Sequence, residues 1–160
     1  MARDPLPAYD TYDNADDYFE GKLHTLAWDE ATNAQKTTAL IEATQRIDRL
    51  RFSGFQVDDD QELEFPRYYD LEAGAEGDEE VPDDILIATY EVAYALLDGV
   101  DPDLELDNLR VTSNAYGNVK MTTAANDTPE HTAAGIPSVT AWRYLLPYLA
   151  PAKTVKLRRV

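Results

Sequence analysis

The most apolar stretch of the chain is residues 81–99, whose interior is interrupted only by Thr89 and Glu91. Pro82 suits the first residue of a helix, and Gly99 suits the left-handed residue that follows a helix end. A helix that is apolar on nearly every side cannot lie on a protein surface. We therefore expect the rest of the chain to wrap this helix, which at ~1.5 Å per residue is too short to cross a membrane.

Three further segments have apolar residues at helical spacing. In the second of them Leu40, Ala43 and Ile47 fall on one face, as expected of a helix that packs on one side only. Thr32 or Asn33 is placed to cap that helix, and a serine precedes the last one. The predicted helices are residues 14–23, residues 33–52 and residues 138–150, the last beginning after Ser138.

The remaining segments favour turns and short strands. Residues 109–113 and 118–122 are rich in β-formers and flank Asn114 to Gly117, which predicts a hairpin over 109–122. The acid-rich residues 70–80 contain two glycines and are expected to form a loop. The fold class predicted is mainly α: a small bundle of about four helices with a short β-hairpin and extended N- and C-terminal arms. Its predicted limits are an arm over 1–12, a domain over 13–150 and a basic arm over 151–160.

The net charge of the chain argues against one broad class of function. The 160 residues carry a formal net charge of −17, with 31 acids against 14 lysines and arginines. Proteins that bind nucleic acid generally neutralise phosphates with basic side chains, so this balance argues against such a role. The chain has no cysteine, which excludes disulfides, thiolate metal sites and cysteine nucleophiles. Its first residues contain no apolar run, so we expect no signal peptide and synthesis in a cytoplasm.

The charges are unevenly distributed. Residues 58–84 hold thirteen acids and one basic residue, Arg67, whereas the last eight residues, 153–160, hold four basic residues and no acid. A basic segment in so acidic a chain is expected to dock on protein, either a neighbouring subunit or a different molecule. The arginines at 46, 49 and 51 are expected to form a solvated basic edge, the alternative being contact with acids elsewhere in the chain.

No catalytic motif is present. The two histidines, His24 and His131, lack partners at a diagnostic spacing, and no phosphate-binding or hydrolase signature occurs. The acids of 58–62 lack the glycine that a calcium loop needs at its sixth position, where Leu63 stands. We therefore predict no enzyme activity, no cofactor and no metal site.

A second run of acids, which alternate with other residues, lies at residues 101–107. Asp101, Asp103, Glu105 and Asp107 alternate, so in extended chain their side chains point the same way. Weak Ca²⁺ or Mg²⁺ binding is one interpretation of that pattern. A solvated strand edge is the more usual one.

Several stretches in order resemble one family. Taken together they resemble the head–tail connector (adaptor) proteins of tailed bacteriophages, including the group labelled DnaT-like single-stranded-DNA-binding proteins. The stretches are residues 15–19, Trp28, residues 39–48, Phe52 with Gly54, residues 61–67, residues 81–85 and residues 145–149. The family motif residues are Trp28, Gln61, Phe65, Pro66 and Arg67, with Phe65 standing where the family usually has tryptophan.

The resemblance implies a structural role in the virion. Similar connectors assemble as a ring of about twelve copies that matches the portal and extends the DNA channel. Implied partners are further copies of the chain, the portal protein and a neck, stopper or tail component, with DNA enclosed rather than specifically bound and no membrane. The implied location is the virion neck, after assembly in the host cytoplasm.

Two sets of residues follow from this reading. An acidic channel wall would let DNA slide without sticking, and the candidates are Asp58, Asp59, Asp60, Asp78, Glu79 and Glu80. The C-terminal arm is expected to dock on the portal or another partner through Lys153, Lys156, Leu157, Arg158 and Arg159. The alternative function is a single-stranded-DNA-binding replication protein, which requires a basic groove with interleaved aromatic residues.

Overall fold

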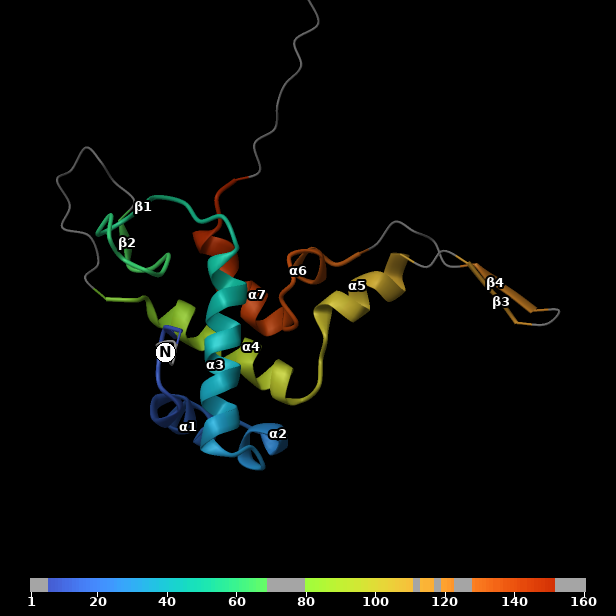
Figure 1. The fold of residues 1–160 in the computed structure, drawn as a ribbon, viewed down its shortest axis with the longest axis horizontal. Helices are drawn as coiled ribbons and strands as arrows, with labels where there is room; N and C mark the ends of the chain where they lie inside the picture. Colours follow the sequence, from blue (N-terminus) through green and yellow to red (C-terminus); the bar gives the residue numbers. More distant parts are fainter. Residues whose placement is uncertain (1–5, 69–79, 111–112, 117–118, 123–127, 152–160) are drawn as a thin grey trace, which may run out of the picture.

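The computed structural model describes residues 6–68, 80–110, 113–116, 119–122 and 128–151, with only the backbone of 109–110 and of the last two strands described. The fold is mainly α, as predicted (Figure 1). The helices are α1 (Tyr12–Glu20), α2 (Leu26–Asp29), α3 (Asn33–Asp48), α4 (Asp83–Leu97), α5 (Pro102–Arg110), α6 (Glu130–Ala133), α7 (Val139–Leu145) and the 3₁₀ turn η1 (Leu146–Tyr148). Strand β1 (Phe55–Gln56) pairs antiparallel with β2 (Arg67–Tyr68), and β3 (Ser113–Tyr116) pairs antiparallel with β4 (Val119–Thr122).

Helix α4 is the centre of the fold, as its composition predicts. It packs against both α3 and α7, and Figure 1 shows α3 lying across it. Ile85, Ala88 and Val92 are completely buried at helical spacing along one side. Burial of a side chain of the size of Ile85 or Val92 stabilises the fold by about 1.5–3 kcal/mol, so packing contributes much of the stability of this helix.

The helix ends follow the expected chemistry. Thr32 caps α3 in a capping box: its Oγ1 accepts from the backbone N–H of Gln35, whose side chain accepts from the N–H of Thr32. Ser138 caps α7 in the same way through the N–H of Ala141. Gly99 has φ of +85° directly after α4. Pro82 precedes the first residue of α4 instead of being that residue.

The expectation of extended chain at the alternating acids 101–107 is wrong, because residues 102–107 lie in α5 and Asp101 directly precedes it. The carboxylate of Asp101 accepts from the N–H groups of Asp103 and Leu104 at 3.0 and 3.1 Å, which caps the helix. Acids in a first turn also suit the positive end of the helix dipole. Since α5 continues to Arg110, the hairpin begins at Ser113 and not at 109.

Three short elements were not predicted. They are α2, which contains Trp28, α6, and the β1–β2 pair, whose two strands flank the acids of 58–64. The two longer helix predictions also end early: α3 stops at Asp48, and Pro147 follows the change from α7 to a 3₁₀ turn.

The described part of the N-terminal segment packs on the domain. Tyr9 is buried, its backbone N–H donates to Thr44 and its hydroxyl donates to Asp48. The hydroxyl of Tyr90 likewise donates to Asp10. Residues 6–11 therefore lie along the bundle and contribute to its core.

Candidate interaction surface

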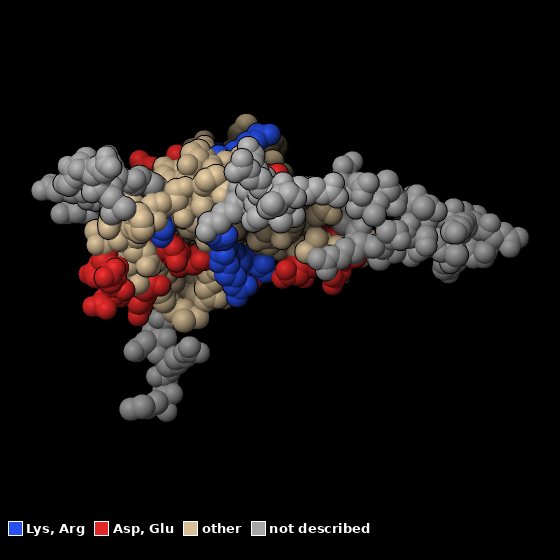
Figure 2. Space-filling view, turned by 90° about the horizontal axis from the view of Figure 1, so that it is seen from above, with Lys and Arg blue, Asp and Glu red and all other residues tan. Residues whose placement is uncertain are grey.

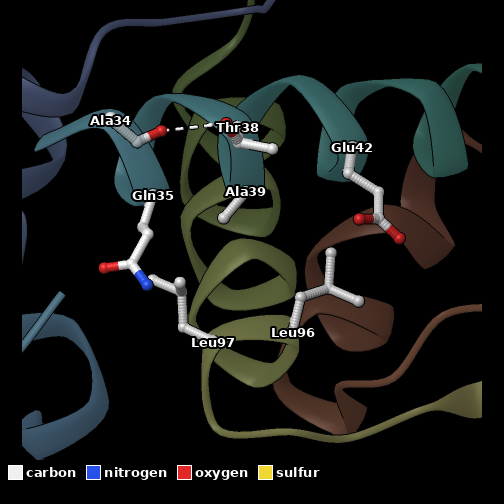
Figure 3. Close-up of a pocket in the computed structure, with 7 residues that line it drawn as sticks. All are labelled: Ala34, Gln35, Thr38, Ala39, Glu42, Leu96 and Leu97. Atoms are coloured by element: carbon white, nitrogen blue, oxygen red, sulfur yellow. Dashed lines mark hydrogen bonds between the residues drawn. The ribbon is translucent and has the colours of Figure 1, made fainter. Parts of the chain in front are cut away.

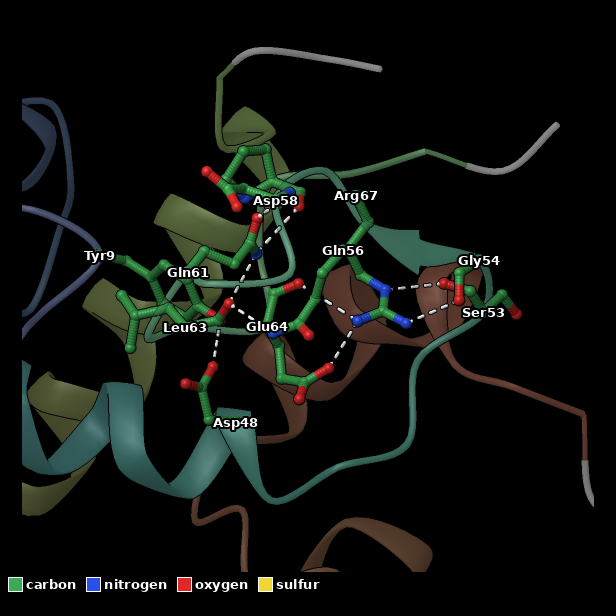
Figure 4. A network of polar contacts seen from close by, with 11 residues as sticks. Tyr9, Asp48, Ser53, Gly54, Gln56, Asp58, Gln61, Leu63, Glu64 and Arg67 are labelled. Atoms are coloured by element: carbon green, nitrogen blue, oxygen red, sulfur yellow. Dashed lines mark hydrogen bonds and ion pairs between the residues drawn. The ribbon is translucent and has the colours of Figure 1, made fainter. Parts of the chain in front are cut away.

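The predicted family motif 61–67 forms a compact turn whose centre is Arg67 (Figure 4). The guanidinium of Arg67 donates through Nε to the carbonyl of Ser53 at 2.9 Å and through a terminal nitrogen to the carbonyl of Gly54 at 2.7 Å. The other terminal nitrogen donates to the carbonyl and the carboxylate of Glu64. Arg67 is only 8% exposed, so it fastens the turn to the segment after α3 and has little surface to offer a ligand.

Gln61 closes the same turn from within. Its amide nitrogen donates to the carbonyls of Leu63 and Pro66 at 2.6 and 3.1 Å, and its oxygen accepts from the N–H of Asp58 at 3.1 Å. Three backbone groups of a tight turn thereby find partners, which such groups require when they are removed from water.

Phe65 anchors the turn in the core. It is 2% exposed and meets the rings of Tyr9, Phe52 and Tyr148 edge-on at centroid distances of 6.1, 4.7 and 5.8 Å. The Phe65–Pro66 peptide bond is cis. The described contacts of these motif residues are with the fold itself, so their structural role is to shape the turn.

Trp28, the remaining motif residue, lies at the opposite end of α3. It is 1% exposed, and its indole N–H donates to the carboxylate of Asp16 at 2.7 Å. The ammonium of Lys36 donates to the same oxygen at 2.7 Å and lies 5.2 Å from the indole ring centre. This cluster joins α1, α2 and the first turn of α3.

The turn presents acids to solvent. Asp58, Asp59 and Asp60 are exposed, with the carboxylate of Asp58 accepting from the N–H of Asp60 at 3.0 Å, and Glu80 is exposed before α4. Figure 2 shows acidic side chains gathered in two groups, one on each side of a basic group. The other two candidate acids, Asp78 and Glu79, lie outside the described residues, as do all the basic candidates of 153–160.

Within the described residues, much of the basic charge is used inside the fold. The pairs are Lys22 with Glu91, Lys36 with Asp16, Arg46 with Glu42, and Arg67 with Glu64. Arg46 also lies 3.6 Å from Asp103 and donates to the carbonyl of Gly135 at 3.2 Å, so it faces acids, whereas Arg49 and Arg51 are exposed as predicted for a basic edge. The described surface is consequently richer in unpaired acids than in unpaired bases.

Burial and carboxylate partners shift several pKa values. The pKa of Tyr9, Tyr18 and Tyr90 is raised, first by burial and then by the carboxylates that accept their hydroxyl protons, so these tyrosines stay neutral donors. Burial also raises the pKa of Asp48, although the Tyr9 hydroxyl and the Glu64 N–H donate to it. Asp48 and its partners form a polar cluster between α3 and the turn.

Several hollows lie along α3, and two of them have partly apolar walls. One, of about 320 Å³, lies between α3 and the end of α4, and Figure 3 shows Leu96 and Leu97 facing Ala39 across it. The other, of about 550 Å³, lies between the N-terminal segment, the end of α3 and the turn 61–67. Its lining residues are Leu6, Pro7, Gln45, Asp48, Arg49, Glu62 and Leu63. The sequence pattern did not predict this groove, because its walls come from three separate segments.

The described residues carry no group of three or more metal-ligating side chains. His131 Nδ1 contacts the carbonyl of Ile136 at 2.9 Å, and His24 is exposed with φ of +61°. No described helix combines the length and the apolar character needed to span a bilayer.

Comparison with known proteins gives one match. A family model described as "Putative DnaT-like ssDNA binding protein" matches residues 6–160. No curated protein and no solved structure matches the chain.

Proposed function

The chain belongs to the family described as "Putative DnaT-like ssDNA binding protein", and within it we propose that the protein is a structural head–tail adaptor of a tailed bacteriophage. In this proposal the copies form a ring, of about twelve subunits, that joins the portal to the neck or tail and surrounds the DNA exit channel. The protein acts in the virion neck by shape and charge and catalyses no reaction.

The observation that carries the proposal is the excess of exposed acid. The net charge is −17, and the positive charges of Lys22, Lys36 and Arg67 are paired with carboxylates within the domain. A surface of this kind repels a phosphate backbone at physiological salt, so DNA can pass along it without adhering. The acids of the turn, Asp58 to Asp60, are the described candidates for the channel wall.

The basic segment 153–160 has a different task in this proposal. Its four basic residues are opposite in charge to the rest of the acid-rich chain and suit an acidic protein surface, either the portal or a neighbouring subunit. The described chain ends at Pro151, directly after a backbone pairing of residues 148–150 with 51–53. That pairing fixes the point from which the segment departs.

The first test is sedimentation of the purified protein with portal rings and a labelled oligo-dT strand. The proposal predicts co-sedimentation with the portal while the oligonucleotide remains unbound. Absence of any portal complex across a range of salt concentrations would refute it.

Deleting Lys153–Val160 gives a second test. The described core contacts all lie within residues 6–151, so the truncated protein should keep its melting temperature within a few degrees. Attachment to portal-bearing heads should be lost, as measured by head–tail joining in extracts. Normal joining by the truncated protein would show that the segment is not an anchor.

A second candidate function is single-stranded-DNA binding, favoured by the printed family description. One described surface feature suits it: Phe55 is 49% exposed and its ring lies 5.8 Å from that of Tyr68, which offers a base a stacking surface. Oligo-dT binding that weakens steeply with salt and falls several-fold in Phe55→Ala, without portal association, would favour this function over the adaptor.

A further inference from the structure

The 550 Å³ groove beside the end of α3 is lined by both apolar and acidic side chains. Leu6, Pro7 and Leu63 supply the apolar part. Asp48 supplies a carboxylate from the end of α3, and Glu62 supplies one from the turn. A groove of this composition suits a ligand that combines apolar and basic side chains.

The acidic charge continues along the chain next to the groove. Only Gln61 separates Glu62 from the exposed Asp58, Asp59 and Asp60, and the Gln61 side chain accepts from the N–H of Asp58, so the acids share one turn. Five carboxylates, counting Asp48, therefore stand against the single guanidinium of Arg49.

One segment of the chain matches this groove in both respects. Residues 152–160 contain four basic side chains and no acid, with Val155, Leu157 and Val160 between or after them. At ~3.3–3.6 Å per residue, nine residues span at most about 30 Å, which is about the diameter of a small domain. We propose that this segment of one copy occupies the groove of the neighbouring copy. The inference rests on the ring of the proposed function and identifies the acidic partner of the tail as the next subunit.

Electrostatics favours the neighbour as the owner of the segment. Two copies that each carry a net charge of −17 repel one another unless a basic element of one reaches the acids of the other. A segment that folds back onto its own groove leaves the net charge of that copy at −17 and does not link it to the next copy. Exchange of the segment between copies supplies both the counter-charge and the contact.

Charge reversal at one exposed position tests the groove. Glu62 is exposed and has no hydrogen bond or ion pair to the other described side chains, so Glu62→Lys should leave the melting temperature unchanged. It should weaken self-association in sedimentation velocity by about tenfold or more, and pairing it with Arg158→Glu should restore part of the loss. Asp17→Lys is the matched control: an exposed acid on α1 with the same charge change and no place in the groove.

A mixing experiment separates exchange between copies from folding back. Tail-deleted chains keep an intact groove, and Glu62→Lys chains keep an intact tail. Neither should associate alone, and an equimolar mixture should form one-to-one pairs that cannot grow further.

A mixture that stays monomeric, or a wild type that is monomeric at every concentration, overturns the inference. Equal loss in Asp17→Lys also overturns it, because the effect would then be one of general charge. Failure to bind portal rings overturns the proposed function instead, so the two failures are distinguishable.

Discussion

Each end of α3 is joined to a neighbouring segment through a carboxylate, but the hydrogen-bond donors to the two carboxylates differ. At its first turn, Lys36 and the indole of Trp28 donate to the carboxylate of Asp16. At its last residue, Asp48 accepts from the hydroxyl of Tyr9 and has an arginine nearby only in the groove wall, with no ion pair to it among the described residues. Each carboxylate joins a neighbouring segment to α3, but only the first has a cation as donor.

The difference appears in the pKa values. Burial of Asp16 opposes its charge, but the donors Lys36 and Trp28 outweigh burial and lower the pKa of this carboxyl. For Asp48 burial outweighs the neutral donors, and the pKa is raised. The negative charge is therefore stabilising on Asp16, at one end of the helix, and costly on Asp48, at the other.

The largest expected effect comes from breaking the turn at the Asp48 end. Arg67→Met removes the donor from two backbone carbonyls and from Glu64, which should cost about 3 kcal/mol of unfolding free energy in a denaturant titration. Arg67→Lys is a sharper test, because the lysine ammonium keeps the positive charge but cannot donate to all the acceptors that the planar guanidinium reaches. If Lys restored full stability, charge alone would hold the turn.

A smaller loss is expected at the other end. Lys36→Met keeps the apolar length of the side chain but leaves Asp16 with only the indole donor, at a cost of about 2 kcal/mol. The measurement is again the free energy of unfolding, with Thr37→Ala as a control one residue away on the exposed side of α3. No loss in Lys36→Met would mean that the ammonium is solvated and contributes nothing.

The smallest expected effects come from neutralising the two carboxylates, and the comparison predicts that the two substitutions change stability in opposite directions. The folded pKa of Asp48 lies above the unfolded value of about 3.9, so ionisation costs stability as pH rises through the folded pKa. Asp48→Asn should then stabilise by up to about 1 kcal/mol at neutral pH, with the gain vanishing below about pH 4.

Asp16→Asn should do the reverse. The folded pKa of Asp16 is lowered, so its stabilisation is present above the unfolded value and is lost as pH falls through the folded pKa. The substitution should cost about 1 kcal/mol at neutral pH and little in strong acid, followed by thermal melts across pH. If both substitutions changed the free energy of unfolding in the same direction, the proposed difference between the two ends of α3 would be wrong.

The helices that pack by apolar area were predictable from the sequence. Helix α4 is apolar on most sides, and α3 has a regular stripe, so period and capping residues located both. Helix α5 was missed because alternating acids have the period of a strand, while the cap that starts the helix depends on the side chain of Asp101. Local patterns do not reveal which of two local structures a capping contact selects.

The candidate site was less predictable. The sequence located Gln61, Phe65 and Arg67 as motif residues but gave no sign that they serve the turn itself, because their partners include Ser53 and Tyr9, far along the chain. The groove at Asp48 was missed for the same reason: its walls meet only in the folded chain. The basic residues of 153–160 were found by composition alone and lie outside the described residues.

The environment of Trp28 gives the protein an optical reporter of one end of α3. The chain has two tryptophans, and the indole of Trp28 is shielded from solvent while a carboxylate and an ammonium lie at its edge and face. Trp142→Phe leaves Trp28 as the single tryptophan, whose emission shifts when water reaches the indole. Opening of the junction between α1, α2 and α3 can therefore be timed by stopped-flow fluorescence, separately from the loss of helix that circular dichroism records.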